Sequence, residues 1–132
     1  MKTSFNELIG KSLRLQKAVT PKDSYDGLLS TAALCKLMLD TAWNLLENEV
    51  HEGVTSVASM IQLNHEEPTV AGETITVEAT VKTVDENKIL IALKAVDETG
   101  TIAHGLNERL IVDKVNLKQL ADQRAAPLKT IL

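Results

Sequence analysis

The longest stretch of helical character in the chain is Leu28–Val50, which has no Gly or Pro in its interior. Apolar residues occupy most of its positions, and at about 100° per residue the polar Lys36 and Asp40 fall within one quadrant. A helix that is apolar around most of its circumference is usually buried on several sides. Ser30 is a suitable N-cap, and Gly53 suits the turn after the helix. The pattern therefore predicts one central helix surrounded by the rest of the chain.

Strand-like patterns account for most of the remaining sequence. Apolar and polar residues alternate in Glu73–Val84, as in an antiparallel strand with one buried face. The segment Lys88–Val96 is apolar on both faces, which indicates a central strand. The predicted strands are Ser12–Val19, Val54–His65, Glu73–Val84, Lys88–Val96 and Thr101–Asp113.

The segments between and after these elements are polar. Pro21–Gly27 is predicted to be a turn-rich loop before the helix. After the last strand, Val115–Ala125 is predicted to form a short helix that packs through Leu117 and Leu120. Ala126–Leu132 is expected to be a loose or docking tail.

The order of elements is one strand, one long helix and then four consecutive strands. This order favours an α+β fold over alternating βαβ units, and a curved antiparallel sheet wrapped around one apolar helix is the hotdog architecture. Such a sheet has an unpaired edge, which two copies can hide by joining their sheets. We therefore expect a homodimer, with further pairing into tetramers left open.

Composition narrows the functional classes. A chain of 132 residues fits one domain, taken as 1–132 with a core of about 12–124. No apolar run is long enough to span a membrane, and the N-terminus lacks the apolar core of a signal peptide, so a cytoplasmic location is expected. The formal charge of −4 and the scarcity of aromatic residues argue against binding of nucleic acids. A single cysteine excludes an internal disulfide and a cysteine zinc site.

His65 and Thr31 are the strongest candidates for chemistry. His65 ends its strand, and strict alternation puts its ring on the core side; the residues expected on that face are Val57, Ser59, Ile61 and Leu63. A half-buried histidine can act as a general base, or can simply be held by a backbone carbonyl. Thr31 lies in the first helical turn, where free N–H groups suit a carbonyl oxygen, although its hydroxyl could merely cap the helix.

Other polar residues are weaker candidates. Asp40 points about 180° away from Thr31 and is expected to pair with Lys36 at the surface. Cys35 is expected to be an inert buried thiol. His51 and His104 lack a metal-ligand spacing with His65, so no metal site is predicted. Arg109 could meet a phosphate or carboxylate or form an interstrand ion pair. No Gly-rich phosphate loop and no Ser-His-Asp set is present.

Three segments together carry a family resemblance that extends from about Val19 to about Asp122. They are LLSTAALCKLM at the helix start, NHEEPTVAGETITVEATV around the histidine, and AVDETGTIAHGLNERLIVD in the last strand. With these segments the chain resembles the fluoroacetyl-CoA thioesterase-like group of hotdog-fold proteins. The resemblance implies hydrolysis of an acyl-CoA thioester at a subunit interface, with coenzyme A as part of the substrate and no separate cofactor.

The resemblance also implies roles for individual residues. Thr31 and His65 would correspond to the catalytic threonine and histidine of the family. Tyr25 resembles an aromatic lid over the acyl pocket, Ser59 a polar group near the thioester carbonyl, and Arg109 the arginine of the last strand.

Two positions depart from the family pattern. Leu39 stands where the family has a glutamate, and Ala58 where it has a glycine that approaches the substrate carbonyl. Glu66, Glu67 and Glu108 are the carboxylates that could replace the glutamate.

These departures keep three functions open. The first is a thioesterase of reduced activity, and the second is a protein that binds acyl-CoA without catalysis. A hydratase acting on enoyl-CoA is the weakest, because no Asp/His pair is placed for it.

Overall fold

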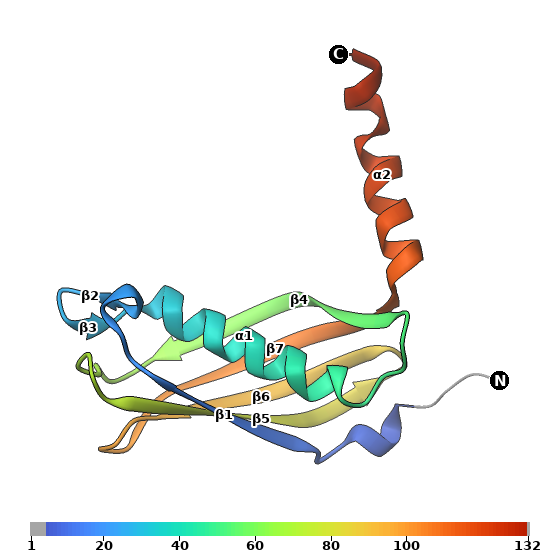
Figure 1. Ribbon diagram of the computed structural model, residues 1–132. Helices are drawn as coiled ribbons and strands as arrows, with labels where there is room; N and C mark the ends of the chain where they lie inside the picture. The colour runs from blue at the N-terminus through green and yellow to red at the C-terminus, as the bar shows by residue number, and fades with distance from the viewer. Residues whose placement is uncertain (1–4, 132) are drawn as a thin grey trace.

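The computed structural model describes residues 5–131 and has the predicted α+β hotdog fold (Figure 1). The elements are the 3₁₀-helices η1 (Asn6–Leu8) and η2 (Pro21–Asp23), the strands β1 (Ser12–Ala18), β2 (Ser24–Tyr25), β3 (Leu28–Leu29), β4 (Val54–His65), β5 (Thr74–Asp85), β6 (Lys88–Val96) and β7 (Thr101–Asp113), and the helices α1 (Thr31–Glu47) and α2 (Lys114–Ile131). Within residues 5–131, neither helix is long and apolar enough to cross a membrane.

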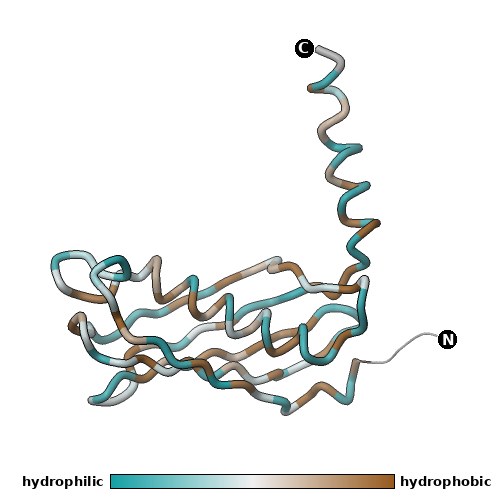
Figure 2. The backbone as a smooth tube through the Cα atoms, in the orientation of Figure 1, coloured by the Kyte–Doolittle hydropathy of each residue, from teal (hydrophilic) through white to brown (hydrophobic). Residues whose placement is uncertain are grey.

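One five-stranded antiparallel sheet forms the body of the protein, in the order β1-β5-β6-β7-β4. The central position of β6 confirms the prediction made from its two apolar faces. Helix α1 lies across one face of this sheet (Figure 1). Figure 2 shows the alternation of apolar and polar residues along the strands.

The core lies between α1 and the sheet face that it covers. Leu34, Met38 and Leu46 of α1 are completely buried against strand residues such as Ile75 and Ile91. Burial of an aliphatic side chain of this size contributes roughly 1.5–3 kcal/mol each. The central-helix prediction is therefore confirmed, with the helix running from Thr31 to Glu47 and Ser30 as its N-cap.

The strand β4 differs from the prediction because it contains a β-bulge. Ala58 pairs with Arg109 and Met60 with Glu108, so Ser59 is an extra residue without a partner in β7. The bulge reverses the side-chain alternation, since one added residue shifts the period of two. Residues before it therefore have the opposite phase from that predicted: Ser56 is buried, whereas Val57 was expected on the core side with His65.

Three other predictions differ from the structure in detail. The Pro21–Gly27 loop contains η2 and β2, and β2 pairs with β3. The segment expected to be a loose or docking tail is helical through Ile131, and Leu132 lies outside the described residues. Leu117 and Leu120 were expected to pack on the body, but they are 36% and 64% exposed.

Candidate active site

The structure brings Thr31 and His65 together. Thr31 is the first residue of α1, because the hydroxyl of Ser30 accepts a hydrogen bond from the N–H of Ala33 and starts the helix. The Oγ1 atom of Thr31 lies 2.8 Å from Nδ1 of His65, at the end of β4. A hydroxyl and an imidazole that are 34 residues apart in the chain therefore form one hydrogen-bonded pair.

The bulge at Ser59 explains why His65 reaches Thr31. Beyond the bulge, Leu63 pairs with Gly105 and His65 with the buried Ala103, so His65 shares the sheet face that α1 covers. Without the additional residue, this end of β4 would turn its other side chains toward α1. The bulge thus sets the direction of the imidazole, which is a common use of bulges beside functional sites.

Hydrogen-bond donors are available at the start of α1. The N–H of Ala33 is bonded to the Ser30 hydroxyl, and the N–H of Leu34 to the Ser30 carbonyl. Within the described part of the chain, the N–H groups of Thr31 and Ala32 have no such acceptor. Free N–H groups and the positive end of the helix dipole favour a carbonyl oxygen or an anion at this place.

The second nitrogen of His65 has an unusual environment. Its Nε2 atom is buried and has no hydrogen-bond partner within residues 5–131. If the hydroxyl of Thr31 donates to Nδ1, the ring hydrogen of the neutral imidazole is on Nε2. A buried N–H without an acceptor is destabilising by about 1–3 kcal/mol. A carboxylate that orients the hydrogen-bonded Thr31–His65 pair would therefore bind at Nε2.

Three glutamates are candidate partners of His65, namely Glu66, Glu67 and Glu108, and they are engaged elsewhere or make no contact with it. Glu66 Oε1 lies 2.7 Å from Nδ1 of His104. Glu108 accepts a hydrogen bond of 2.8 Å from the hydroxyl of Ser59. Because Nε2 has no partner and Nδ1 contacts Thr31, none of these glutamates orients His65 in the described chain.

Arg109 lies at the other end of β4 from His65. It pairs with Ala58, seven residues before His65, and its side chain is only 5% exposed. Its guanidinium donates to the hydroxyl and carbonyl of Ser56 and to the side-chain oxygen of Asn107, at 2.8, 3.2 and 3.0 Å. Burial lowers the pKa of Arg109, and the nearby Glu47 carboxylate partly opposes this. The expected interstrand ion pair is absent among the described residues, and the partners of Arg109 are neutral.

The remaining candidates are spread around this region. Tyr25 is 77% exposed on the short β2–β3 hairpin that precedes α1. Ala58 and Ser59 are exposed at the bulge of β4. Leu39 is half-buried on α1, two turns beyond Thr31.

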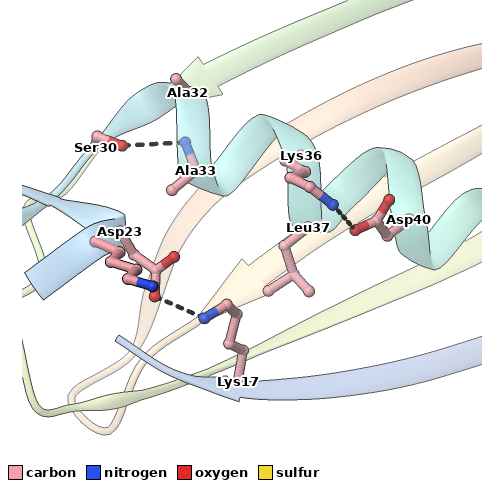
Figure 3. Close-up of a pocket in the computed structure, with 9 residues that line it drawn as sticks. Lys17, Asp23, Ser30, Ala32, Ala33, Lys36, Leu37 and Asp40 are labelled. Carbon is pink, nitrogen blue, oxygen red and sulfur yellow. Dashed lines mark hydrogen bonds and ion pairs between the residues drawn. The ribbon is translucent and has the colours of Figure 1, made fainter. Parts of the chain in front are cut away.

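Asp40 forms the expected surface pair with Lys36, at 2.7 Å. Both residues line a groove of charged and small residues along α1, together with Lys17 and Asp23 (Figure 3). Lys17 is bonded to Asp23 at 2.7 Å in this groove, and neither Thr31 nor His65 lines it. The groove reaches the start of α1 at Ser30 and Ala32, but the hydroxyl–imidazole pair is not part of its lining.

Sequence reasoning missed Thr69, which holds the site together. Thr69 is completely buried in the loop after β4, and its hydroxyl donates to Asp97 at 2.8 Å. Its carbonyl accepts the N–H of Leu29, two residues before Thr31. Burial raises the pKa of Asp97, but hydrogen bonds from Thr69 and two backbone amides outweigh this, so the pKa lies below its usual value. The Pro68-Thr69 turn was visible in the sequence, but no spacing rule links it to Leu29.

The fold defines the class of protein. A five-stranded antiparallel sheet curled around one helix places the chain among hotdog-fold proteins. The same fold is found in a thioesterase superfamily member from Thermus thermophilus, at a TM-score of 0.87 and 18% identity over 92% of this chain and 96% of that one. The chain belongs to the fluoroacetyl-CoA-specific thioesterase family, whose model matches residues 15–115.

Two further solved structures share the fold. A hot-dog-like protein from Thermanaerovibrio acidaminovorans is 30% identical over 92% of this chain and 97% of that chain, with a TM-score of 0.85. The fluoroacetyl-CoA thioesterase FlK is 20% identical over 87% of this chain and 95% of its own, with a TM-score of 0.79. No curated protein matches the chain.

Proposed function

We propose that this protein is an acyl-CoA thioesterase that hydrolyses a small acyl thioester with Thr31 and His65. The observation that carries the proposal is the 2.8 Å contact between Thr31 Oγ1 and His65 Nδ1 at the start of α1. Family membership supplies the reaction class, and a threonine-to-serine variant of FlK has been crystallised with acetyl-CoA.

The proposed reaction begins with the thioester carbonyl oxygen at the N-terminus of α1. The N–H groups of Thr31 and Ala32 stabilise the negative charge that develops on this oxygen. His65 takes a proton from water, or from the Thr31 hydroxyl, as the oxygen attacks the carbonyl carbon. The C–S bond then breaks, and the proton leaves with the thiol of coenzyme A. Attack by Thr31 forms an acyl ester that water hydrolyses in a second step.

Substrate binding in this proposal follows the family pattern. Tyr25 covers the acyl group from the exposed hairpin before α1. The family pattern alone assigns Ser59 and Ala58 places beside the thioester, since they lie six and seven residues before His65 on β4. Arg109 is the least supported of the group, because its guanidinium is already bonded to Ser56 and Asn107. A homodimer formed through the unpaired edge of β4 completes the pocket, since hotdog sheets are joined in this way to hide an edge.

Hydrolysis of a panel of short acyl-CoA thioesters tests the proposal. We expect His65→Ala to reduce kcat/KM by roughly 10²–10⁴, the usual contribution of a general base. His51→Ala is the matched control, because His51 is exposed and the hydrogen bond of its ring is to the neighbouring Glu52 carbonyl, at 2.9 Å. Equal rates for wild type, His65→Ala and His51→Ala would refute the mechanism.

A second function is favoured by one specific observation. The unpartnered Nε2 atom of His65, with Leu39 at the family glutamate position, supports a protein that binds acyl-CoA without hydrolysing it. Calorimetry with a non-hydrolysable acyl-CoA analogue, combined with a turnover assay over hours, separates the two. Tight binding without turnover would show that the protein binds acyl-CoA and does not hydrolyse it.

A further inference from the structure

The C-terminal helix α2 has almost no contact with the body of its own chain. It has 18 residues, and all its described side chains are exposed except the half-buried Ala125. Figure 1 shows that it stands away from the sheet and from α1. Most of the stability of a helix in a protein comes from tertiary packing, and α2 also has the helix-breaking Pro127 inside it. Its stability therefore depends on contacts outside its own domain.

One face of α2 is shaped for such contacts. A shallow groove along the helix is lined by Leu117, Leu120, Ala121, Arg124, Ala125, Pro127 and Leu128. At about 100° per residue this set forms one stripe, with Gln119 on the opposite side. Leu120 and Leu128 are each 64% exposed. The recurrence of apolar residues along the helix is visible in Figure 2.

The direction of α2 relates it to the free edge of the sheet. The N–H of Lys114 donates to the carbonyl of Gly53, just before β4, at 3.0 Å. In Figure 1, α2 extends beyond β4, away from the other strands. β4 is an edge strand, and its Met60 and Ile61 are 37% and 38% exposed. The helix therefore extends past the edge of its own sheet, toward the side on which a second sheet paired with β4 would lie (Figure 1).

The charges of α2 and of the body are complementary. With four basic residues and only Asp122 acidic, residues 114–132 have a formal charge of +3. The whole chain has a charge of −4, which leaves −7 for residues 1–113. A basic helix with an apolar stripe therefore fits the acidic body of another copy of this chain, whereas two copies of α2 would repel each other.

We propose that α2 is an arm that packs its apolar stripe on the body of a second copy. Two β4 strands paired antiparallel across a two-fold axis would put Val54 of one copy beside His65 of the other. The root of α2 then lies next to the exposed Glu66 and Glu67 of the second copy. This inference depends on the dimer of the proposed function. It adds a docking site for α2, at the end of the sheet that carries His65.

Cross-linking between single-cysteine chains tests the arm. In a Cys35→Ser background, which removes the one native cysteine, a chain with Leu117→Cys, on the stripe and one turn from the root of α2, is mixed with a chain carrying Glu67→Cys and oxidised. We expect a covalent heterodimer. Gln119→Cys, on the opposite face of α2, is the control and should cross-link to Glu67→Cys at least tenfold less. Equal cross-linking of both positions, or none, would overturn the proposal.

Two further measurements separate the alternatives. Cross-links only between two Leu117→Cys chains would mean that α2 packs on α2, which also overturns the arm. Sedimentation of the full chain shows whether a dimer exists: a dimer without the Leu117–Glu67 cross-link rejects the arm alone, and a monomer rejects arm and dimer together. Thioester hydrolysis, measured without oxidation, reports on the catalytic proposal independently.

A charge-matched pair of variants gives a second test of the same face. Leu120→Glu/Leu128→Glu should weaken the dimer at least about tenfold in Kd, because the stripe loses two apolar contacts. Gln119→Glu/Gln123→Glu adds the same charge off the stripe and should leave the Kd within about threefold. Similar Kd values for the two double variants would contradict the docking of the stripe.

Discussion

Replacing Gly105 by alanine tests whether the close spacing of β4 and β7 keeps His65 in position. Gly105 lies in β7 opposite Leu63, two residues before His65. A Cβ atom at this position would lie 2.6 Å from the carbonyl oxygen of Gln62 and 3.6 Å from Sδ of Met38. A carbon and an oxygen normally approach to about 3.3 Å, so β4 must move by roughly 0.7 Å. The Gln62 oxygen belongs to the backbone, so no side-chain rotation can relieve the contact.

The expected effect on stability and activity follows from this displacement. Overpacking of this kind costs about 1–3 kcal/mol in the free energy of unfolding, which corresponds to a fall in Tm of roughly 3–12 °C. Movement of β4 by this amount would lengthen the 2.8 Å contact between Thr31 and His65 to about 3.5 Å, the limit for a hydrogen bond. Misplacement of a catalytic group by about 1 Å can reduce the rate about a hundredfold. We expect kcat/KM to fall between ten- and a hundredfold, at about the same factor for each acyl-CoA.

Thermal unfolding and thioester hydrolysis of Gly105→Ala measure the two effects. Gly100→Ala is the matched control, because its Cβ would meet no atom within 4 Å and its backbone is not left-handed. A Gly105→Ala protein with the Tm and the rate of Gly100→Ala would refute the reasoning, since β4 would then tolerate the added methyl group without moving His65.

Three other changes probe the site and the fold. Leu39→Glu should raise kcat at least about tenfold if the carboxylate accepts a hydrogen bond from His65. Leu39→Gln is the uncharged control, and no gain of Glu over Gln would contradict a role for a carboxylate at this position. Arg109→Lys should lower the free energy of unfolding by about 1–3 kcal/mol in denaturant titrations and leave KM unchanged, because the planar guanidinium of Arg109 donates its hydrogen bonds within the fold. A raised KM at unchanged stability would instead make Arg109 a substrate ligand. Hydrogen bonds from Lys17 and then from the Thr20 amide and hydroxyl lower the pKa of Asp23 from 3.8 to about 2, so its ionised form stabilises the fold above about pH 4 and this contribution is lost as the pH falls toward 2. The difference in Tm between wild type and Asp23→Asn should therefore narrow between about pH 5 and pH 2, and a constant difference would count against this carboxylate.

Much of the fold was predictable because hydrophobic periodicity determines it directly. The bounds of β4, β6 and β7 agree with the segments taken from the alternation of apolar and polar residues. The apolar circumference of α1 predicted its burial, and Ser30 predicted its first turn. These features depend on residues that are close together in the chain, so the pattern of the sequence is enough to predict them.

The parts that were missed depend on contacts between distant residues. The bulge at Ser59 arises from the pairing of β4 with β7, and the residue types around this position do not indicate a bulge. The same holds for the burial of Arg109 between Ser56 and Asn107, which its charge alone would not suggest. The pairing of Thr31 with His65 was suggested by family resemblance, and its geometry needed the structure.

The length of α2 was underestimated because Pro127 normally ends a helix, whereas here it lies inside one. The expected packing of Leu117 and Leu120 assumed that an amphipathic helix covers its own domain. These two leucines are exposed in the single chain, which is why we propose that they pack on a second copy.

The central claim is that Thr31 and His65 act as one hydrolytic unit, and a double-mutant cycle on kcat tests it most directly. Thr31→Val removes the hydroxyl at nearly constant shape, and His65→Gln removes the base. If the two groups act together, each single variant should lose roughly 10²–10⁴ in kcat on a short acyl-CoA, and the double variant should be no slower than the slower single one. Losses that multiply in the double variant, or a wild-type rate that neither change affects, would contradict the account.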